Sequence, residues 1–316
     1  IKAAVQNAVS ARAASNAPQE KFVALDIGPL GKLLRPFGDL DFEKAVSVFA
    51  ETVRLGVKYN VDLIVIETMN DSYETKAALL AAKENSSLPV FVTNAYGEDG
   101  KLITGATPEA MVAMLEGMGA DAVGANCSLG PSQLQSVAKR ILSCASVPVI
   151  MKPNAGMPKS VDGKTVFDVD AEDFCREMRI MAENGVTVLG GCCGTNDSYI
   201  KKLIETLKDV KLKKPAEKNL TVVSSYTHAV YFDKKPVIIG ERINPTGKKR
   251  FKQALLENDI GYILSEGLSE QENGADILDV NVGIPGIDEG AMLEKAVFEL
   301  QSVLDLPLQI DTSDII

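Results

Sequence analysis

Short apolar runs and amphipathic segments alternate strictly along the first two-thirds of the chain, and this alternation limits the possible folds more than any other feature. The runs have the length and composition of buried strands, and the segments between them have helical spacing of apolar residues. Strands are expected over 22–25, 63–66, 90–93, 122–125, 147–151 and 186–189, and helices over 1–15, 42–58, 73–84, 107–117, 131–143, 170–183 and 196–208. Such alternation predicts an α/β fold with a parallel sheet.

Polar or reactive residues stand at or just past the carboxyl end of most of these runs. They are Asp26, Glu67, Asn94, Cys127, Lys152, Asn154 and Cys192. An open doubly wound sheet gathers its site where the strand order reverses, whereas a (βα)8 TIM-type barrel collects strand-end residues from around one face. The spread over many strand ends favours the barrel. Six strand–helix units in place of eight predict that it lacks about two N-terminal strands.

A polar, lysine-rich stretch over 209–219 separates this pattern from a second one. Such composition is typical of a domain boundary. Beyond it, strands are expected over 237–239, 277–280 and 308–310, with one helix from 249 that breaks near Asp259 and another over 290–302. We therefore expect an incomplete barrel over 1–212, a linker over 213–235, and a second barrel over 236–316 that stops after about three strands.

The two ends of the sequence and its composition restrict its context. Because the sequence starts inside a helical segment and ends just after a strand, we expect a fragment of a longer protein, cut at both ends. Its 33 basic and 43 acidic residues give a net charge of −10, which argues against a nucleic-acid partner. No long apolar run predicts a membrane span. Five irregularly spaced cysteines do not form a secreted disulfide framework, so we expect a cytoplasmic protein with reduced thiols.

Three of the five cysteines stand at strand ends, in segments rich in glycine. Cys192 and Cys193 lie in Gly-Gly-Cys-Cys-Gly-Thr over 190–195, and Cys127 lies in Gly-Ala-Asn-Cys-Ser-Leu-Gly over 124–130. Both segments are expected to open into one barrel mouth. Thiolate is a good zinc ligand, and a catalytic zinc keeps three protein ligands and one open position. The pattern predicts a zinc site at these cysteines that activates a thiol substrate.

Other interpretations of the cysteines stay open at this point. The three could be small buried apolar residues, or Cys192 and Cys193 could form a vicinal disulfide. A zinc site closed by a fourth protein ligand would be structural instead of catalytic. The single histidine, His228, falls in the connector and is expected to be a connector residue, not a ligand. Cys144 and Cys175 lie in helical segments, and we assign them to packing.

The same motifs carry a resemblance to known families. The Gly-Gly-Cys-Cys-Gly-Thr and Asn-Cys segments, with Met-Lys-Pro-Asn-Ala-Gly-Met-Pro over 151–158 and Asp-Ile-Gly-Pro over 26–29, resemble the homocysteine S-methyltransferase domain. Ile-Gly-Glu-Arg-Ile-Asn-Pro-Thr-Gly over 239–247 and Leu-Asp-Val-Asn-Val-Gly over 278–283 resemble the start of a pterin-binding methyltetrahydrofolate barrel. Their tandem order is similar to that of the cobalamin-dependent methionine synthase family.

This resemblance implies two substrate sites. The first would hold zinc on the three cysteines and homocysteine, with Glu67 and Asp26 at the ammonium group of that substrate. The second would bind 5-methyltetrahydrofolate through strand-end polar groups, namely Glu241, Asn244, Asp279, Asn281 and Asp311. Methylcobalamin would carry the methyl group between the sites, held by a module absent from this chain. The implied products are methionine and tetrahydrofolate.

Three other functions fit parts of the sequence. A cobalamin-independent homocysteine S-methyltransferase, using a sulfonium or betaine donor, would leave the second module unexplained. A pterin-binding domain of another pathway, such as dihydropteroate synthesis, would leave the cysteines unexplained. A non-catalytic scaffold stabilised by zinc would need a fourth protein ligand on the metal.

Overall fold

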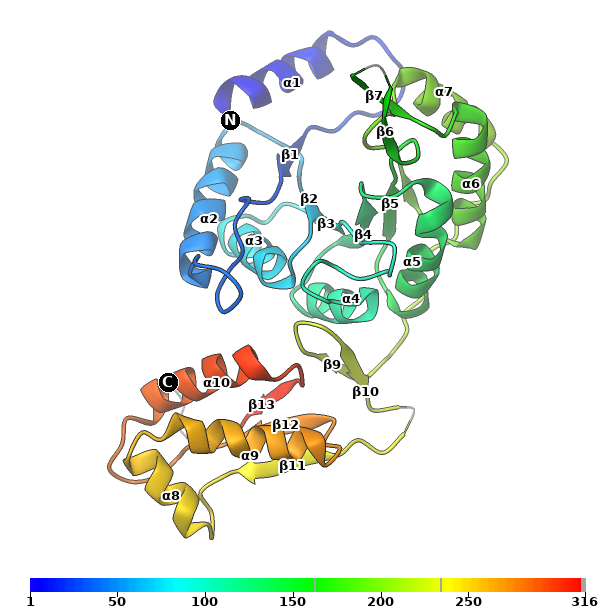
Figure 1. Ribbon diagram of the computed structural model, residues 1–316. Coiled ribbons are helices and arrows are strands. Elements are labelled where there is room, and N and C mark those ends of the chain that lie inside the picture. The colour runs from blue at the N-terminus through cyan, green and yellow to red at the C-terminus, as the bar shows by residue number, and fades with distance from the viewer. Residues whose placement is uncertain (162, 234, 314–316) are drawn as a thin grey trace. The chain divides into compact units, whose positions relative to one another are not determined.

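The computed structural model describes residues 1–161, 163–233 and 235–313, and the chain divides into two compact units, Ile1–Asn219 and Leu220–Ile316 (Figure 1). The first unit contains one six-stranded parallel sheet. Its strands are β1 (Ala24–Ile27), β2 (Leu63–Met69), β3 (Val90–Asn94), β4 (Ala122–Asn126), β5 (Val149–Lys152) and β8 (Val188–Leu189). The predicted α/β fold with a parallel sheet is therefore confirmed.

The strands of this sheet follow one another in chain order, β1-β2-β3-β4-β5-β8, with no reversal. A doubly wound sheet would show a reversal, so the order has the form of a barrel wall. Helices α2 to α6 lie around the outside of the strands in Figure 1. The helices of this unit are α1 (Lys2–Ala14), α2 (Phe42–Lys58), α3 (Ser72–Asn85), α4 (Pro108–Gly117), α5 (Pro131–Cys144), α6 (Ala171–Asn184) and α7 (Asp197–Thr206).

Side chains just ahead of several helices explain where those helices begin. The side chains of Asp71, Thr107, Asp170 and Asn196 accept hydrogen bonds from backbone N–H groups in the first turns of α3, α4, α6 and α7. These N–H groups have no partner inside the helix, so each cap stabilises its helix by about 1 kcal/mol. These four helices therefore begin at defined residues, which limits the length of the loops that precede them.

The core of the first unit lies between the sheet and the helices. Ile64 and Ile66 of β2, Val92 of β3 and Phe49 of α2 are almost completely buried. Burial of such side chains is the main favourable term in folding, at about 25 cal/mol for each Å² of apolar surface. In the part of the chain that the structure describes, every helix is too short or too polar to cross a bilayer.

The structure differs from the sequence predictions at two hairpins and at the ends of several strands. An antiparallel hairpin, β6 (Pro158–Val161) with β7 (Lys164–Phe167), is inserted between β5 and α6, and its residues are mostly exposed, so no buried face marks it in the sequence. A second hairpin, β9 (Val222–Ser224) with β10 (Ala229–Tyr231), occupies the predicted linker. Strand β1 begins later than predicted, because Phe22 is 65% exposed whereas Ile27 is buried.

The second unit also holds a parallel sheet, with three strands in the order β11-β12-β13. Its strands are β11 (Ile239–Ile243), β12 (Ile277–Val280) and β13 (Leu308–Ile310), and its helices are α8 (Lys249–Leu256), α9 (Ile260–Glu272) and α10 (Glu289–Val303). The predicted helix break is confirmed: Asn258 has φ +56°, and the Asp259 side chain accepts from the N–H of Tyr262 to start α9. Extension of this sheet into a full barrel stays a prediction.

We predict that Gly124→Ala destabilises the protein by about 3 kcal/mol. A Cβ atom at Gly124 in β4 would lie 1.9 Å from the carbonyl oxygen of Ile150 in β5, so these two strands would have to separate. Gly117→Ala, in α4, is the matched control, since a Cβ there meets no atom within 4 Å; it should be neutral or stabilise by up to about 1 kcal/mol. Urea unfolding followed by circular dichroism checks both, and equal midpoints would contradict the prediction.

Candidate metal centre

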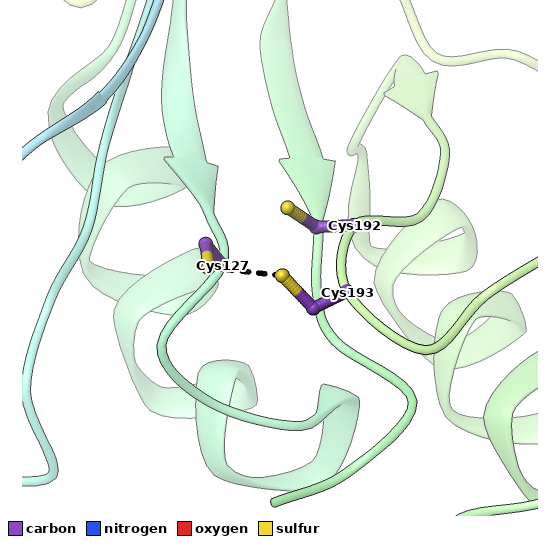
Figure 2. A group of neighbouring side chains, drawn as sticks. All are labelled: Cys127, Cys192 and Cys193. Atoms are coloured by element: carbon purple, nitrogen blue, oxygen red, sulfur yellow. Dashed lines mark hydrogen bonds between the residues drawn. The ribbon is translucent and has the colours of Figure 1, made fainter. Parts of the chain in front are cut away.

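The sulfur atoms of Cys127, Cys192 and Cys193 converge on one point at the carboxyl end of the sheet. All three Sγ atoms lie within 4.8 Å of one another, and those of Cys127 and Cys193 are 3.8 Å apart (Figure 2). A tetrahedral zinc ion with Zn–S distances of about 2.3 Å holds its sulfur ligands about 3.8 Å apart. The spacing of the three thiols therefore suits a zinc ion without a large rearrangement.

The structure also decides between the interpretations of these cysteines that the sequence left open. Cys192 and Cys193 are free thiols, so the vicinal disulfide is not formed. Cys193 is exposed, and Cys127 and Cys192 are partly exposed, which is wrong for small apolar core residues. Cys144 and Cys175 are buried in helices α5 and α6, as their assignment to packing requires.

Backbone hydrogen bonds tie together the loops that carry the three sulfurs. The loop after β5 lies between the loops after β4 and β8 and bonds to both. On the β4 side, the N–H of Cys127 donates to the carbonyl oxygen of Lys152, and the N–H of Asn154 donates to that of Leu129. On the β8 side, the N–H of Ala155 donates to the carbonyl oxygen of Cys193, and the N–H of Cys192 donates to that of Pro153. These four bonds are 2.8–3.1 Å long. The buried Asn154 side chain adds a fifth bond, since its Oδ1 accepts from the N–H of Cys193 at 3.0 Å. Hydrogen bonds thus hold the two cysteine loops together through the loop after β5.

Unusual backbone conformations shape the cysteine loops. Cys127 and Ser128 both have positive φ, 60° and 58°, a region that non-glycine residues rarely enter. Gly194 has φ +80°, and a Cβ there would lie 2.4 Å from the ring of Phe167 on β7. The glycine after the cysteine pair is therefore required both by its φ and by the hairpin packed against it.

The three thiols shift one another's pKa values. The pKa of Cys127 is lowered, chiefly because the Cys192 thiol donates a hydrogen bond to its thiolate, and the pKa of Cys192 is raised by the same bond and by burial. The pKa of Cys193 is raised by burial and by its neighbour Cys127. The cluster accordingly favours a single negative charge when it is alone. A bound dication would be needed to hold all three as thiolates.

The side chains around the cluster determine whether a metal ion there would have a fourth protein ligand, and the Asn154 amide is one neighbour, hydrogen-bonded to Cys127. Among the described residues, the group that could hold a metal ion consists of the three cysteines, without a histidine or a carboxylate. His228 lies in the turn between β9 and β10, where its Nδ1 faces the hydroxyl groups of Thr227 and Ser225 at 3.0 and 3.4 Å. Three thiols match the number of protein ligands that a catalytic zinc ion uses.

Two acids predicted to bind substrate lie near a lysine at the same end of the sheet. Glu67 of β2 forms an ion pair with Lys152 of β5, and both side chains are about a quarter exposed. The pKa of Asp26 is raised by burial and by the charge of Glu67, while Lys152 lowers it. Lys152 thus pairs with Glu67, and the charges of both act on Asp26. The sequence marked Lys152 as a strand-end residue but carried no signal that it would pair with Glu67.

Four of the five predicted pterin-binding residues lie at the carboxyl ends of β11, β12 and β13, and Glu241 lies in the middle of β11. Asn244 Nδ2 donates to Glu241 at 3.1 Å, and Asn281 Nδ2 donates to Asp311 at 2.9 Å. Asp279 is 5% exposed and accepts from Gln309, a residue that the sequence prediction missed because amides on strands are common. Burial raises the pKa of Asp279, and the charges of Asp311 and Glu241 raise it further, so the structure brings these acids together.

Comparisons with known proteins agree with this architecture. Residues 1–207 match the model of the homocysteine S-methyltransferase family. The methionine synthases of Mycobacterium leprae and Mycobacterium tuberculosis are each 27% identical to this chain over 310 and 307 residues. Each alignment covers 94% of this chain, and the chain spans about a quarter of the length of these relatives, 26% and 25%.

Among solved structures, the apo form of the homocysteine methyltransferase MmuM from Escherichia coli has a similar fold. The TM-score is 0.52 at 20% identity, over 64% of this chain and 68% of that chain. The matched family segment contains the six-stranded sheet and all three clustered cysteines. The chain belongs to the homocysteine S-methyltransferase family.

Proposed function

We propose that this chain supplies the two substrate sites of a cobalamin-dependent methionine synthase. In the proposed reaction a methyl group passes from 5-methyltetrahydrofolate, by way of cobalamin, to the sulfur of homocysteine, and methionine and tetrahydrofolate are formed. The convergence of three cysteine sulfurs, which no histidine or carboxylate of the described residues joins, is the observation that carries the proposal. Similarity to two methionine synthases along 94% of the chain supports the choice of methyl donor.

The three cysteines would hold the metal, and homocysteine would enter at the open position. Bound zinc would keep the substrate thiol as a thiolate near neutral pH and would orient it for methyl transfer. Cys193 is exposed, so a thiol can approach the cluster from solvent. Asn154 and the backbone bonds of the β5 loop keep the cysteine loops in place while the substrate binds.

Glu67 and Asp26 would receive the ammonium group of homocysteine. The Lys152 ammonium already occupies this position beside Glu67, so the site is suited to a cation. Homocysteine brings both an ammonium and a carboxylate group. Its ammonium would replace the Lys152 ammonium beside Glu67, and its carboxylate would pair with the displaced lysine, so that no charge would lose its partner. A charge-assisted hydrogen bond to Glu67 would fix the amino-acid end while the thiol reaches the metal.

The second unit would bind the pterin ring of 5-methyltetrahydrofolate. The acids and amides at the carboxyl ends of β11 to β13 match the donor and acceptor groups of an aminopyrimidinone ring. Loss of the methyl group requires protonation of the folate on its ring nitrogen, and these polar side chains would stabilise the charge that develops. We further propose a cytoplasmic location, and a cobalamin-binding module outside this sequence as the partner of both sites.

We predict that Cys127→Ser, Cys192→Ser or Cys193→Ser lowers zinc affinity by more than about a hundredfold. Residues that only support a metal ligand are worth roughly tenfold to a hundredfold in affinity, and loss of a ligand itself should cost more. Cys144→Ala is the matched control, because this thiol is buried in α5 outside the cluster. Zinc content after dialysis against a chelator provides the measurement. Equal zinc content in all four variants would rule out the site.

We predict that Glu67→Gln raises the KM for homocysteine by roughly tenfold to a hundredfold, the worth of a charge-assisted hydrogen bond. Zinc affinity should stay unchanged, since Glu67 is not among the metal-ligating groups. Methionine formation with methylcobalamin as donor measures the KM. Glu43→Gln, an exposed acid on α2, is the control. An unchanged KM in Glu67→Gln would remove this residue from the substrate site.

We predict that Asp279→Asn weakens 5-methyltetrahydrofolate binding about tenfold without affecting zinc. Because the pKa of Asp279 is raised, the affinity of the parent protein should fall as the pH falls through this raised pKa, and the variant should lack that decline. Isothermal titration calorimetry at several pH values tests both statements, with Glu294→Gln on the exposed face of α10 as control. Equal affinity for the parent and Asp279→Asn would contradict the assignment.

A further inference from the structure

Asn126, the last residue of β4, is completely buried and uses every donor and acceptor of its side-chain amide. Its Oδ1 accepts from the N–H of Thr68 at 2.8 Å and from the hydroxyl of Thr93 at 2.7 Å. Its Nδ2 donates to the hydroxyl of Thr68 at 2.8 Å and to the Sγ of Cys192 at 3.9 Å. One primary amide has two donor hydrogens and two acceptor lone pairs, so this side chain is fully satisfied.

Thr68 has a backbone conformation that needs such support. Its φ is +61°, a region that a β-branched residue almost never adopts. The pairing of β2 with β3 shifts register at this point, between Ile66 and Met69. Two of the four Asn126 bonds go to Thr68, one to its N–H and one to its hydroxyl. Since Glu67 is joined to Thr68 by this peptide group, the same two bonds fix the direction in which the Glu67 side chain leaves the strand.

The other end of the amide reaches the metal centre. Cys192 receives the Nδ2–H of Asn126 on its sulfur. An N–H group that points at a metal-bound thiolate stabilises the charge on sulfur and restricts its position. Such a hydrogen bond also makes the thiolate a weaker nucleophile.

We propose that Asn126 is a positioning residue that couples the metal ligand Cys192 to the strand end carrying Glu67. The Cys192 half of the proposal needs only that the cluster binds a metal ion. The Glu67 half rests on the proposed function, in which Glu67 holds the ammonium group of homocysteine. Through one buried amide, the distance between the thiol end and the amino-acid end of the substrate site is set.

Two substitutions separate the two halves. Asn126→Ala removes all four bonds, and we expect zinc affinity to fall roughly tenfold to a hundredfold and the KM for homocysteine to rise. Asn126→Asp has the same shape and still accepts from Thr68 and Thr93, but it presents a carboxylate instead of an N–H to Cys192. It should lose zinc affinity at least as strongly while the KM, measured at saturating zinc, stays close to that of the parent.

The matched control is Asn94→Ala. Asn94 is also a completely buried asparagine at a strand end, in the adjacent β3, but it bonds to the Met69 carbonyl and the Thr75 hydroxyl and to no sulfur. It should lower stability in urea as Asn126→Ala does, yet leave zinc affinity unchanged. Cobalt(II) in place of zinc adds a second readout, because loss of the N–H donor should move the sulfur-to-cobalt charge-transfer band to lower energy in both Asn126 variants and not in Asn94→Ala.

Zinc affinity is measured on the parent and variant proteins by competition with a chromophoric chelator. Affinities within twofold of the parent and an unmoved cobalt band in both Asn126 variants would overturn the inference and leave the proposed function standing. A parent protein that binds no zinc would overturn both. A KM that rises equally in Asn126→Asp and Asn126→Ala, despite saturating zinc, would overturn the Glu67 half.

Discussion

The metal centre depends on the loop after β5, which supplies no sulfur but lies between the two loops that do. In the sheet, β5 separates β4 from β8. Neighbouring strands lie about 4.8 Å apart, so two strands separated by a third are about 10 Å apart. The three sulfurs nevertheless lie within 4.8 Å of one another, because both cysteine loops lean over the β5 loop and bond to it. Without these bonds, the three sulfurs would lie too far apart to bind one metal ion.

Curvature of the sheet brings together the charged side chains that are candidates for binding substrate. Glu67 is on β2 and Lys152 is on β5, with β3 and β4 between them. On a flat sheet these strands would be about 14 Å apart. Their ion pair shows that the sheet curls enough for strand ends to meet across its mouth. Asp26, at the β1 edge, is influenced by the same two charges. The three cysteines and a group of charged side chains thus lie at one end of a curved sheet.

Much of this arrangement could be predicted from sequence, since buried parallel strands require apolar runs, and reactive residues of such folds stand at strand ends. The three cysteines were found in this way. The role of Asn126 was not, because its identity signals nothing until Thr68 and Cys192 are seen beside it. The partnership of Glu67 with Lys152 was also hidden, since it depends on curvature. The β6–β7 hairpin was missed because its residues are mostly exposed, so no alternation of apolar and polar residues marks its strands.

X-ray absorption at the zinc edge tests the central claim most directly, which is that three cysteines hold a metal ion with one position left for a thiol substrate. We expect about one zinc ion per chain and three sulfur ligands before homocysteine is added, and four sulfur ligands afterwards. Four protein ligands at the start, or a sulfur count that homocysteine does not change, would contradict the account.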